Sequence, residues 1–99
     1  MMEYQSTRNP ELRATAAQAV LQGLAPDGGL YTMPSLAQVK LDWQAVLQLD
    51  TLSMAAKILS ALLPDFPDME DIVRKSYAGK FPTADLTPLV PVGDKYVLE

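Results

Sequence analysis

Apolar and polar positions in the first quarter of the chain predict a short strand followed by a short helix. Residues 3–7 form a run that predicts a strand, and Arg8-Asn9-Pro10 then ends it. Thr15 and Gln18 have the spacing of a capping box, in which each side chain bonds the backbone amide of the other residue. A helix is therefore predicted to begin after Thr15, with Gly23 placed where a residue of positive φ would stop it.

Two further helices are predicted in the middle of the chain. One covers about 42–49, where the apolar positions Trp43, Val46, Leu47 and Leu49 form one side. The next begins at Asp50 or Thr51, either of which has a side chain suited to a helix N-cap. Its apolar face continues to about Leu63, before Pro64 ends the helix.

A fourth helix and a hairpin are predicted in the last third of the chain. Asp68 is expected to cap the helix, and Gly79 and Pro82 to close it. Over 87–99, two short apolar stretches flank Gly93-Asp94, which is typical of a β-hairpin.

These elements predict an α+β fold. The chain is expected to be small and mainly helical, with three to four short helices and short strands near both its ends, and residues 1–86 are expected to form one domain. The chain reaches Glu99 with its last apolar residues still in strand register. We therefore expect residues 87–99 to be the start of a hairpin that leads into a further domain.

The loop between the first helix and the next extended residues is the most distinctive local feature. The sequence Pro26-Asp27-Gly28 predicts a turn, because proline presets φ, aspartate bonds nearby amides and glycine accepts positive φ. Leu30-Tyr31-Thr32 then reads as extended. The loop is either a plain turn or a place where the backbone approaches a ligand or a neighbouring domain. It matches neither a dinucleotide-binding nor a P-loop glycine pattern.

Composition narrows the class of protein. With 99 residues and 48% hydrophobic content, the chain is long enough for a single small core. A net charge of −4 without a basic stripe argues against nucleic-acid binding. No apolar run approaches the roughly 20 residues of a membrane helix, and the N-terminus lacks the pattern of a secretory signal. A cytoplasmic location is therefore expected.

The absence of cysteine and histidine excludes several kinds of catalytic site. Without either residue there is no disulfide, no thiolate nucleophile, no imidazole base and no usual zinc site. Carboxylate and lysine chemistry remain. The candidate lysines for a Schiff base are Lys40, Lys57, Lys75, Lys80 and Lys95. Four lie among charged or loop residues, and Lys57 lies between apolar neighbours on a predicted helix, so none is predicted to be catalytic.

An acidic cluster in the second half of the chain is a candidate metal site. Its members are Asp65, Asp68, Glu70 and Asp71. They lack the alternating ligand spacing of a calcium loop, and acids in a first helical turn interact favourably with the helix dipole. The cluster is therefore predicted to cap a helix, and no metal site is expected.

Three stretches together resemble the N-terminal domain of threonine synthases. Residues 4–9 are similar to the family's Tyr-x-Ser-Thr-Arg opening, and residues 22–31 resemble its most characteristic N-terminal run almost residue for residue. Residues 55–61 are similar to the helix that follows the family's central linker. One departure is that both Thr32 and Met33 stand before the next proline, where the family usually has a single residue.

The resemblance implies a function for a longer parent protein. Threonine synthases are fold-type II lyases of threonine biosynthesis that use pyridoxal 5'-phosphate to convert O-phospho-L-homoserine and water to L-threonine and phosphate. The resemblance implies that the cofactor lysine and the substrate-phosphate residues lie downstream of this chain, whose partners would be those downstream domains. The chain itself would bind no cofactor. Its possible contribution is the rim of the active site, from Asp27, Gly28, Gly29, Leu30 and Tyr31.

Two alternatives stay open at the level of sequence. One is a related phospho-lyase that acts on another phosphorylated amino acid, which only downstream pocket residues could distinguish. The other is a stand-alone, non-enzymatic helical interaction module.

Overall fold

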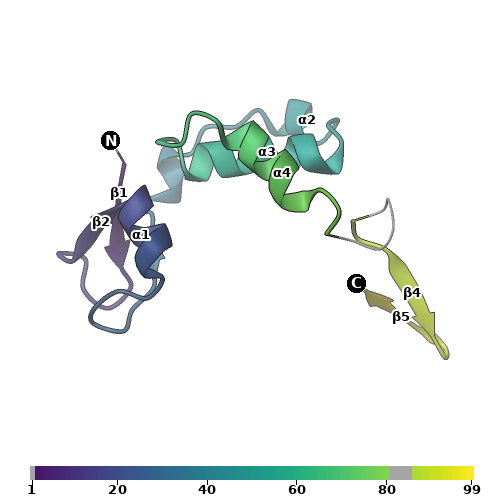
Figure 1. Cartoon of the computed structure of the whole chain (residues 1–99), viewed down its shortest axis with the longest axis horizontal. Coiled ribbons are helices and arrows are strands. Elements are labelled where there is room, and N and C mark those ends of the chain that lie inside the picture. The colour runs from purple at the N-terminus through teal and green to yellow at the C-terminus, as the bar shows by residue number, and fades with distance from the viewer. Residues whose placement is uncertain (1, 81–85) are drawn as a thin grey trace.

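The computed structural model describes residues 2–80 and 86–99 of the chain. Three parts follow one another: a small sheet with one helix, a group of helices, and a β-hairpin (Figure 1). This arrangement confirms the predicted α+β fold with short strands near both ends. The proposed boundary between residues 1–86 and 87–99 stays a prediction, and Pro82 lies outside the described residues.

A three-stranded antiparallel sheet forms the N-terminal part. Strand β1 (Glu3–Ser6) lies between β2 (Arg13–Thr15) and β3 (Tyr31–Thr32). The strand expected over 3–7 is confirmed, whereas β2 was not predicted. Residues 8–10 do interrupt the strand, but the amide of Ser6 donates to the carbonyl of Leu12 at 3.0 Å, so the interruption is the loop of a hairpin. Three residues are too few to show a strand period, which explains the miss.

Helix α1 (Ala16–Gln22) follows β2 directly, and its predicted capping box is confirmed. The amide of Gln18 donates to Thr15 Oγ1 at 3.3 Å, and the amide of Thr15 donates to Gln18 Oε1 at 2.9 Å. Gly23 ends the helix with φ of +78°, a value that L side chains rarely adopt.

The next segment differs from its prediction. A 3₁₀ turn, η1 (Leu36–Gln38), comes first in this segment. In place of the helix expected over 42–49 there is a single helical turn, α2 (Trp43–Val46). The helix over 42–49 was therefore predicted too long. Asp50 is extended, at φ −67° and ψ 168°, because it caps the following helix, and residues 47–49 form turns leading into it.

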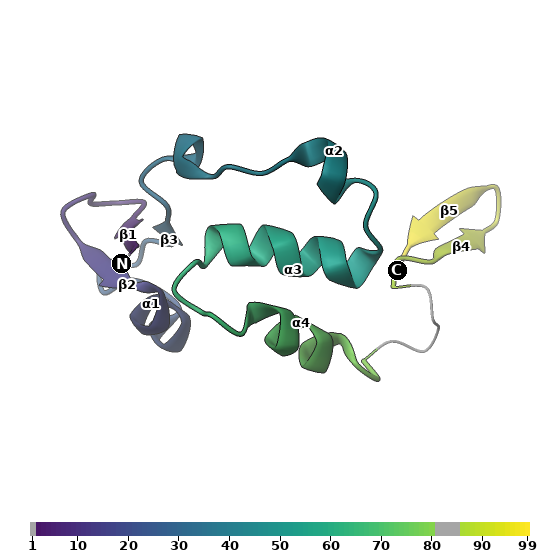
Figure 2. The ribbon, with the colours of Figure 1, turned by 90° about the horizontal axis from the view of Figure 1, so that it is seen from above.

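Two antiparallel helices form the core of the middle part (Figure 2). Helix α3 (Thr51–Leu62) is capped by Asp50, which accepts from the amide of Ser53 at 2.8 Å. Helix α4 (Met69–Tyr77) begins after Asp68 as predicted, but the Asp68 side chain makes no capping hydrogen bond. The buried core between the two helices is Ala56, Met69 and Val73, with partly buried apolar residues around it.

The predicted hairpin is confirmed as β4 (Leu89–Val92) and β5 (Lys95–Leu98). Gly93 opens the two-residue turn with φ of +62°, as the first central residue of a primed hairpin turn requires. Almost every residue of both strands is exposed to solvent.

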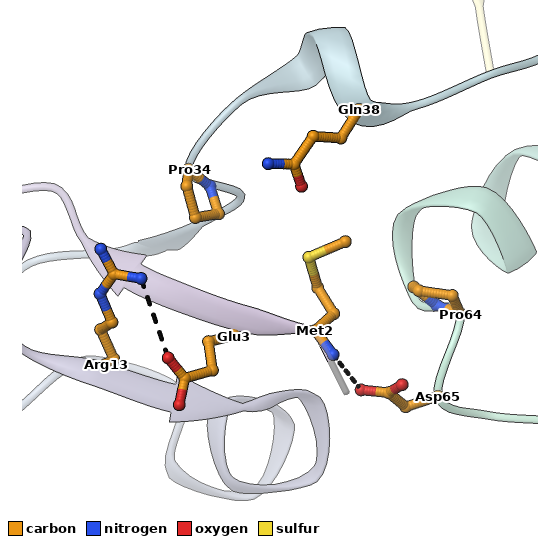
Figure 3. Close-up of a pocket in the computed structure, with 7 residues that line it drawn as sticks. All are labelled: Met2, Glu3, Arg13, Pro34, Gln38, Pro64 and Asp65. Carbon is orange, nitrogen blue, oxygen red and sulfur yellow. Dashed lines mark hydrogen bonds and ion pairs between the residues drawn. The ribbon is translucent and has the colours of Figure 1, made fainter.

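The N-terminal sheet is joined to the helices where β1 meets the C-terminal end of α3. The hydroxyl of Tyr4 donates to the carbonyl of Leu62, and the amide of Met2 donates to Asp65 at 3.0 Å. An open pocket of about 610 Å³ lies at this junction (Figure 3). The charged groups that line this pocket already have partners in the protein. Glu3 forms an ion pair with Arg13 at 3.8 Å, and Asp65 accepts a hydrogen bond from the Met2 amide.

Candidate functional site

Two segments that are far apart in sequence meet around the loop after α1. Ser6, at the end of β1, lies with its Oγ 2.8 and 2.9 Å from the two carboxylate oxygens of Asp27. The same Oγ accepts the amide of Arg8 at 3.1 Å. Ser6 is only 3% exposed, so its hydroxyl is held in place by the fold rather than shared with solvent.

The loop itself is a tight turn with the residue chemistry that the sequence predicts. The amide of Gly28 donates to the carbonyl of Ala25 at 2.8 Å, which closes the turn around Pro26 and Asp27. Gly28 has φ of +82°. The amide of Gly29 donates back to Asp27 Oδ1 at 2.9 Å, so the aspartate bonds a nearby amide as expected.

Gly29 is required by space and not by its backbone angles. A Cβ added at this position would lie 2.2 Å from Ser6 Oγ and 3.1 Å from both Asp27 Oδ1 and Thr7 Oγ1. The missing side chain therefore allows the loop to approach β1 closely enough for the Ser6–Asp27 contact.

Thr7 and Arg8 complete the attachment of the loop. The amide of Thr7 donates to the carbonyl of Leu30 at 2.8 Å, and the amide of Leu30 donates to Thr7 Oγ1 at 3.0 Å. Arg8 Nη1 donates to the carbonyl of Asp27 at 3.0 Å and would lie 3.1 Å from a Cβ on Gly28. The loop is thus fixed by both backbone and side-chain hydrogen bonds.

The electrostatics of the loop suit a structural carboxylate. Hydrogen bonds from the Gly29 amide and the Ser6 hydroxyl lower the pKa of Asp27, with a further contribution from the positive charge of Arg8. Asp27 is therefore ionised at neutral pH and acts as a hydrogen-bond acceptor. This arrangement holds the loop in shape.

The five residues expected to form a rim are consecutive and make up one loop, and their place at an active site stays a prediction. We call Asp27, Gly28, Gly29, Leu30 and Tyr31 the rim loop. Leu30 is 59% exposed, and the hydroxyl of Tyr31 donates to Gln22 Oε1 at 2.6 Å. The sequence did not predict that Ser6, Thr7 and Arg8 hold this loop. The only available signal was that residues 4–9 and 22–31 both belong to the resemblance.

None of the candidate lysines has the surroundings of a Schiff-base lysine. All five are exposed to solvent, Lys57 included, and Lys75 forms an ion pair with Asp71 at 2.8 Å. That pairing raises the pKa of Lys75, whereas an amine nucleophile needs a lowered pKa. These residues therefore do not fit a site for pyridoxal phosphate.

The acidic residues also have other roles. Glu70 pairs with Arg74 at 3.3 Å and Asp71 with Lys75, each one turn apart on α4. Within residues 2–80 and 86–99, no three acidic side chains gather in a way that could hold a metal ion. In the same residues, no helix has the length and apolar character needed to cross a membrane.

Comparisons with known proteins point to one family. A family model described as threonine synthase N terminus matches residues 3–77. The threonine synthase of Corynebacterium glutamicum is 35% identical over 98% of this chain and 22% of its own length. That of Saccharomyces cerevisiae is 34% identical over 93% of this chain and 20% of its own length.

The fold is also similar to that of a solved structure. The crystal structure of threonine synthase from Escherichia coli matches with a TM-score of 0.70 and 31% identity, over 91% of this chain and 21% of the other. The chain therefore spans about a fifth of the length of the relatives that it matches.

Proposed function

Because this chain belongs to the threonine synthase family, in the N-terminal domain, we propose that it works as the N-terminal domain of a longer threonine synthase. The full protein would convert O-phospho-L-homoserine and water to L-threonine and phosphate. This chain would not perform the chemistry. It would pack against the catalytic domains and shape the mouth of the active site.

The observation that supports this proposal most is the meeting of the two motif segments. Residues 4–9 and 22–31 carry most of the resemblance to the family, and they form one hydrogen-bonded cluster through Ser6–Asp27, Thr7–Leu30 and Arg8–Asp27. A turn that only connected two elements would not need a buried serine and a glycine without room for Cβ. We propose that the cluster holds the rim loop in a fixed position at the active site.

The exposure of the lysines supports the proposal that this chain shapes the active site without holding the cofactor. A lyase acting on a phosphorylated amino acid with pyridoxal phosphate needs a cofactor lysine, and the lysines here are exposed. When bound, the cofactor supplies an electron sink for carbanion chemistry. The residues that hold it would belong to the rest of the longer protein. The contribution of this chain would be to orient the substrate and to exclude water.

The charge distribution is compatible with an anionic substrate. Glu70 and Asp71 lie on the exposed face of α4 and are paired with cations one turn away. At the rim loop, the one carboxylate is that of Asp27, which is engaged by Ser6 and Gly29, with Arg8 close by. An incoming phosphate group would therefore not face an unpaired carboxylate at the rim.

The proposal is tested with two proteins, this chain and the full-length product of its gene. Each is scanned for the visible absorbance of pyridoxal phosphate and assayed for phosphate release from O-phosphohomoserine. A silent chain beside a yellow, active full-length protein is the expected result. A yellow protein that releases no phosphate would point to another phospho-lyase of the same fold. Absence of cofactor from both proteins would refute the proposed function.

A further inference from the structure

The segment of the N-terminal part that carries α1 has no charged residue. From Ala14 to Pro26 the chain contains no charged residue, although the whole chain carries 20 charged residues as 8 basic and 12 acidic side chains. This stretch includes all of α1, which lies at the outer end of the molecule (Figures 1 and 2). Its exposed polar residues are the uncharged Gln18 and Gln22, whereas solvent-facing helices usually also carry charged residues on the outer face.

Four aliphatic side chains in this region are more than half exposed. They are Val20 (63%), Leu21 (89%), Leu24 (58%) and Leu30 (59%). We call this set the docking face. Single exposed leucines are ordinary on protein surfaces, but several exposed aliphatic side chains gathered around one short helix are typical of an interaction site.

The docking face is continuous with the rim loop. Val20 and Leu30 line one side of a groove of about 380 Å³, together with Ala16, Ala19 and Tyr31. Leu21 lines the neighbouring hollow together with Tyr31, and Arg13 lies at the edge of the docking face in the same hollow. A body that fills this groove would therefore contact two of the five rim-loop residues directly.

We propose that the docking face is covered by the remainder of the same polypeptide, through an apolar patch on the catalytic domains. This inference rests on the proposed function. Its support is that relatives are about five times longer than this chain, so a covalently attached partner is expected in the full protein. Burial of the docking face would fix the position of α1. Leu30 and Tyr31 line the same groove and belong to the rim loop, so the rim loop would be held in place as well.

The size of the docking face favours an attached partner over a second copy of the chain. The docking face consists of four side chains, and even the largest apolar patch of an ordinary single chain covers only roughly 300–600 Å². A stable interface between separate proteins buries roughly 800 Å² on each side. A covalent connection provides a high effective concentration, so a smaller contact suffices.

Cysteine labelling of the full-length gene product tests this inference. Because this chain has no native cysteine, Leu21→Cys places a reporter on the docking face and Lys75→Cys places a control on the charged face of α4. Labelling of the peptides that contain positions 21 and 75 is followed by mass spectrometry. We expect Leu21→Cys to react about tenfold or more slowly than Lys75→Cys, since a covered residue reacts only after local opening.

Each outcome separates the possibilities. Equal labelling rates at the two positions would show that the docking face is not covered, which would refute the proposal. Protection that disappears on dilution would show that a second copy covers it, which also refutes the proposal. A protein that releases phosphate from O-phosphohomoserine yet labels quickly at position 21 refutes only this inference. A protected protein without activity refutes only the proposed reaction. A gene product no longer than this chain would overturn both.

Discussion

Ser6 and Asp27, 21 residues apart, are joined by a buried hydroxyl that lies 2.8 and 2.9 Å from the two carboxylate oxygens. This contact connects the end of β1 to the turn after α1, and it gives the rim loop a fixed position relative to the sheet. The predictions below follow from this contact, from the space around Gly29 and from the junction between the sheet and the helices.

Ser6→Ala is expected to destabilise this chain. The substitution removes a donor to Asp27 and an acceptor for the Arg8 amide, so the free energy of unfolding should fall by about 1–3 kcal/mol. Urea denaturation followed by circular dichroism measures the change. Ser60→Ala on α3 is the control and should have a smaller effect, because no hydrogen bond of comparable importance is lost. Equal effects would contradict the structural role of Ser6.

Gly29→Ala is expected to destabilise by about 1–3 kcal/mol, because the new Cβ would overlap Ser6 Oγ. The two substitutions should not be additive. In the double variant Ser6→Ala/Gly29→Ala the nearest obstructing atom is gone, so the combined loss should be clearly smaller than the sum of the two single losses. Strict additivity in the same denaturation experiment would show that the two residues do not share this space.

Tyr4→Phe is expected to weaken the junction between the sheet and the helices. Tyr4 is 6% exposed and its hydroxyl donates to the carbonyl of Leu62, so its loss leaves a backbone acceptor without this donor. The free energy of unfolding should fall by about 1 kcal/mol. Tyr31→Phe, which removes an exposed hydrogen bond to Gln22, is the control and should cost less. The reverse order would argue against this junction.

The stability of the rim loop is expected to depend on pH in acid. Because the pKa of Asp27 is lowered in the folded state, its ionised form stabilises the fold. This contribution is fully present above the unfolded pKa of about 3.9 and is lost as pH falls through the lower folded pKa. The difference in unfolding free energy between this chain and Asp27→Asn should therefore shrink below pH 4. A difference that stays constant down to pH 2 would be inconsistent with the lowered pKa.

Local signals in the sequence were sufficient for most of the elements. The capping box at Thr15 and Gln18, a cap at Asp50 or Thr51 and the turn at Gly93-Asp94 were predicted because each depends on residues within a few positions of one another. The strand β2 was missed because its three residues are defined by pairing with β1. The helix expected over 42–49 was predicted too long because Asp50 is extended and caps the next helix.

The candidate site shows the same division. The turn at Asp27 and Gly28 was predicted from residue types, because proline, aspartate and glycine act locally. The role of Ser6 was not, since it depends on a contact across 21 residues. The reason for Gly29 was equally hidden, because its lack of space is created by Ser6 and not by its own φ.

The most direct measurement compares kcat/KM for O-phosphohomoserine in two variants of the full-length gene product, Asp27→Ala and Asp50→Ala. Both aspartates accept a backbone amide, from Gly29 at 2.9 Å and from Ser53 at 2.8 Å, and hydrogen bonding lowers the pKa of each. Only Asp27 belongs to the rim loop. We expect Asp27→Ala to lower kcat/KM by about tenfold or more and Asp50→Ala to leave it nearly unchanged. Unchanged kinetics in a stably folded Asp27→Ala variant would contradict it.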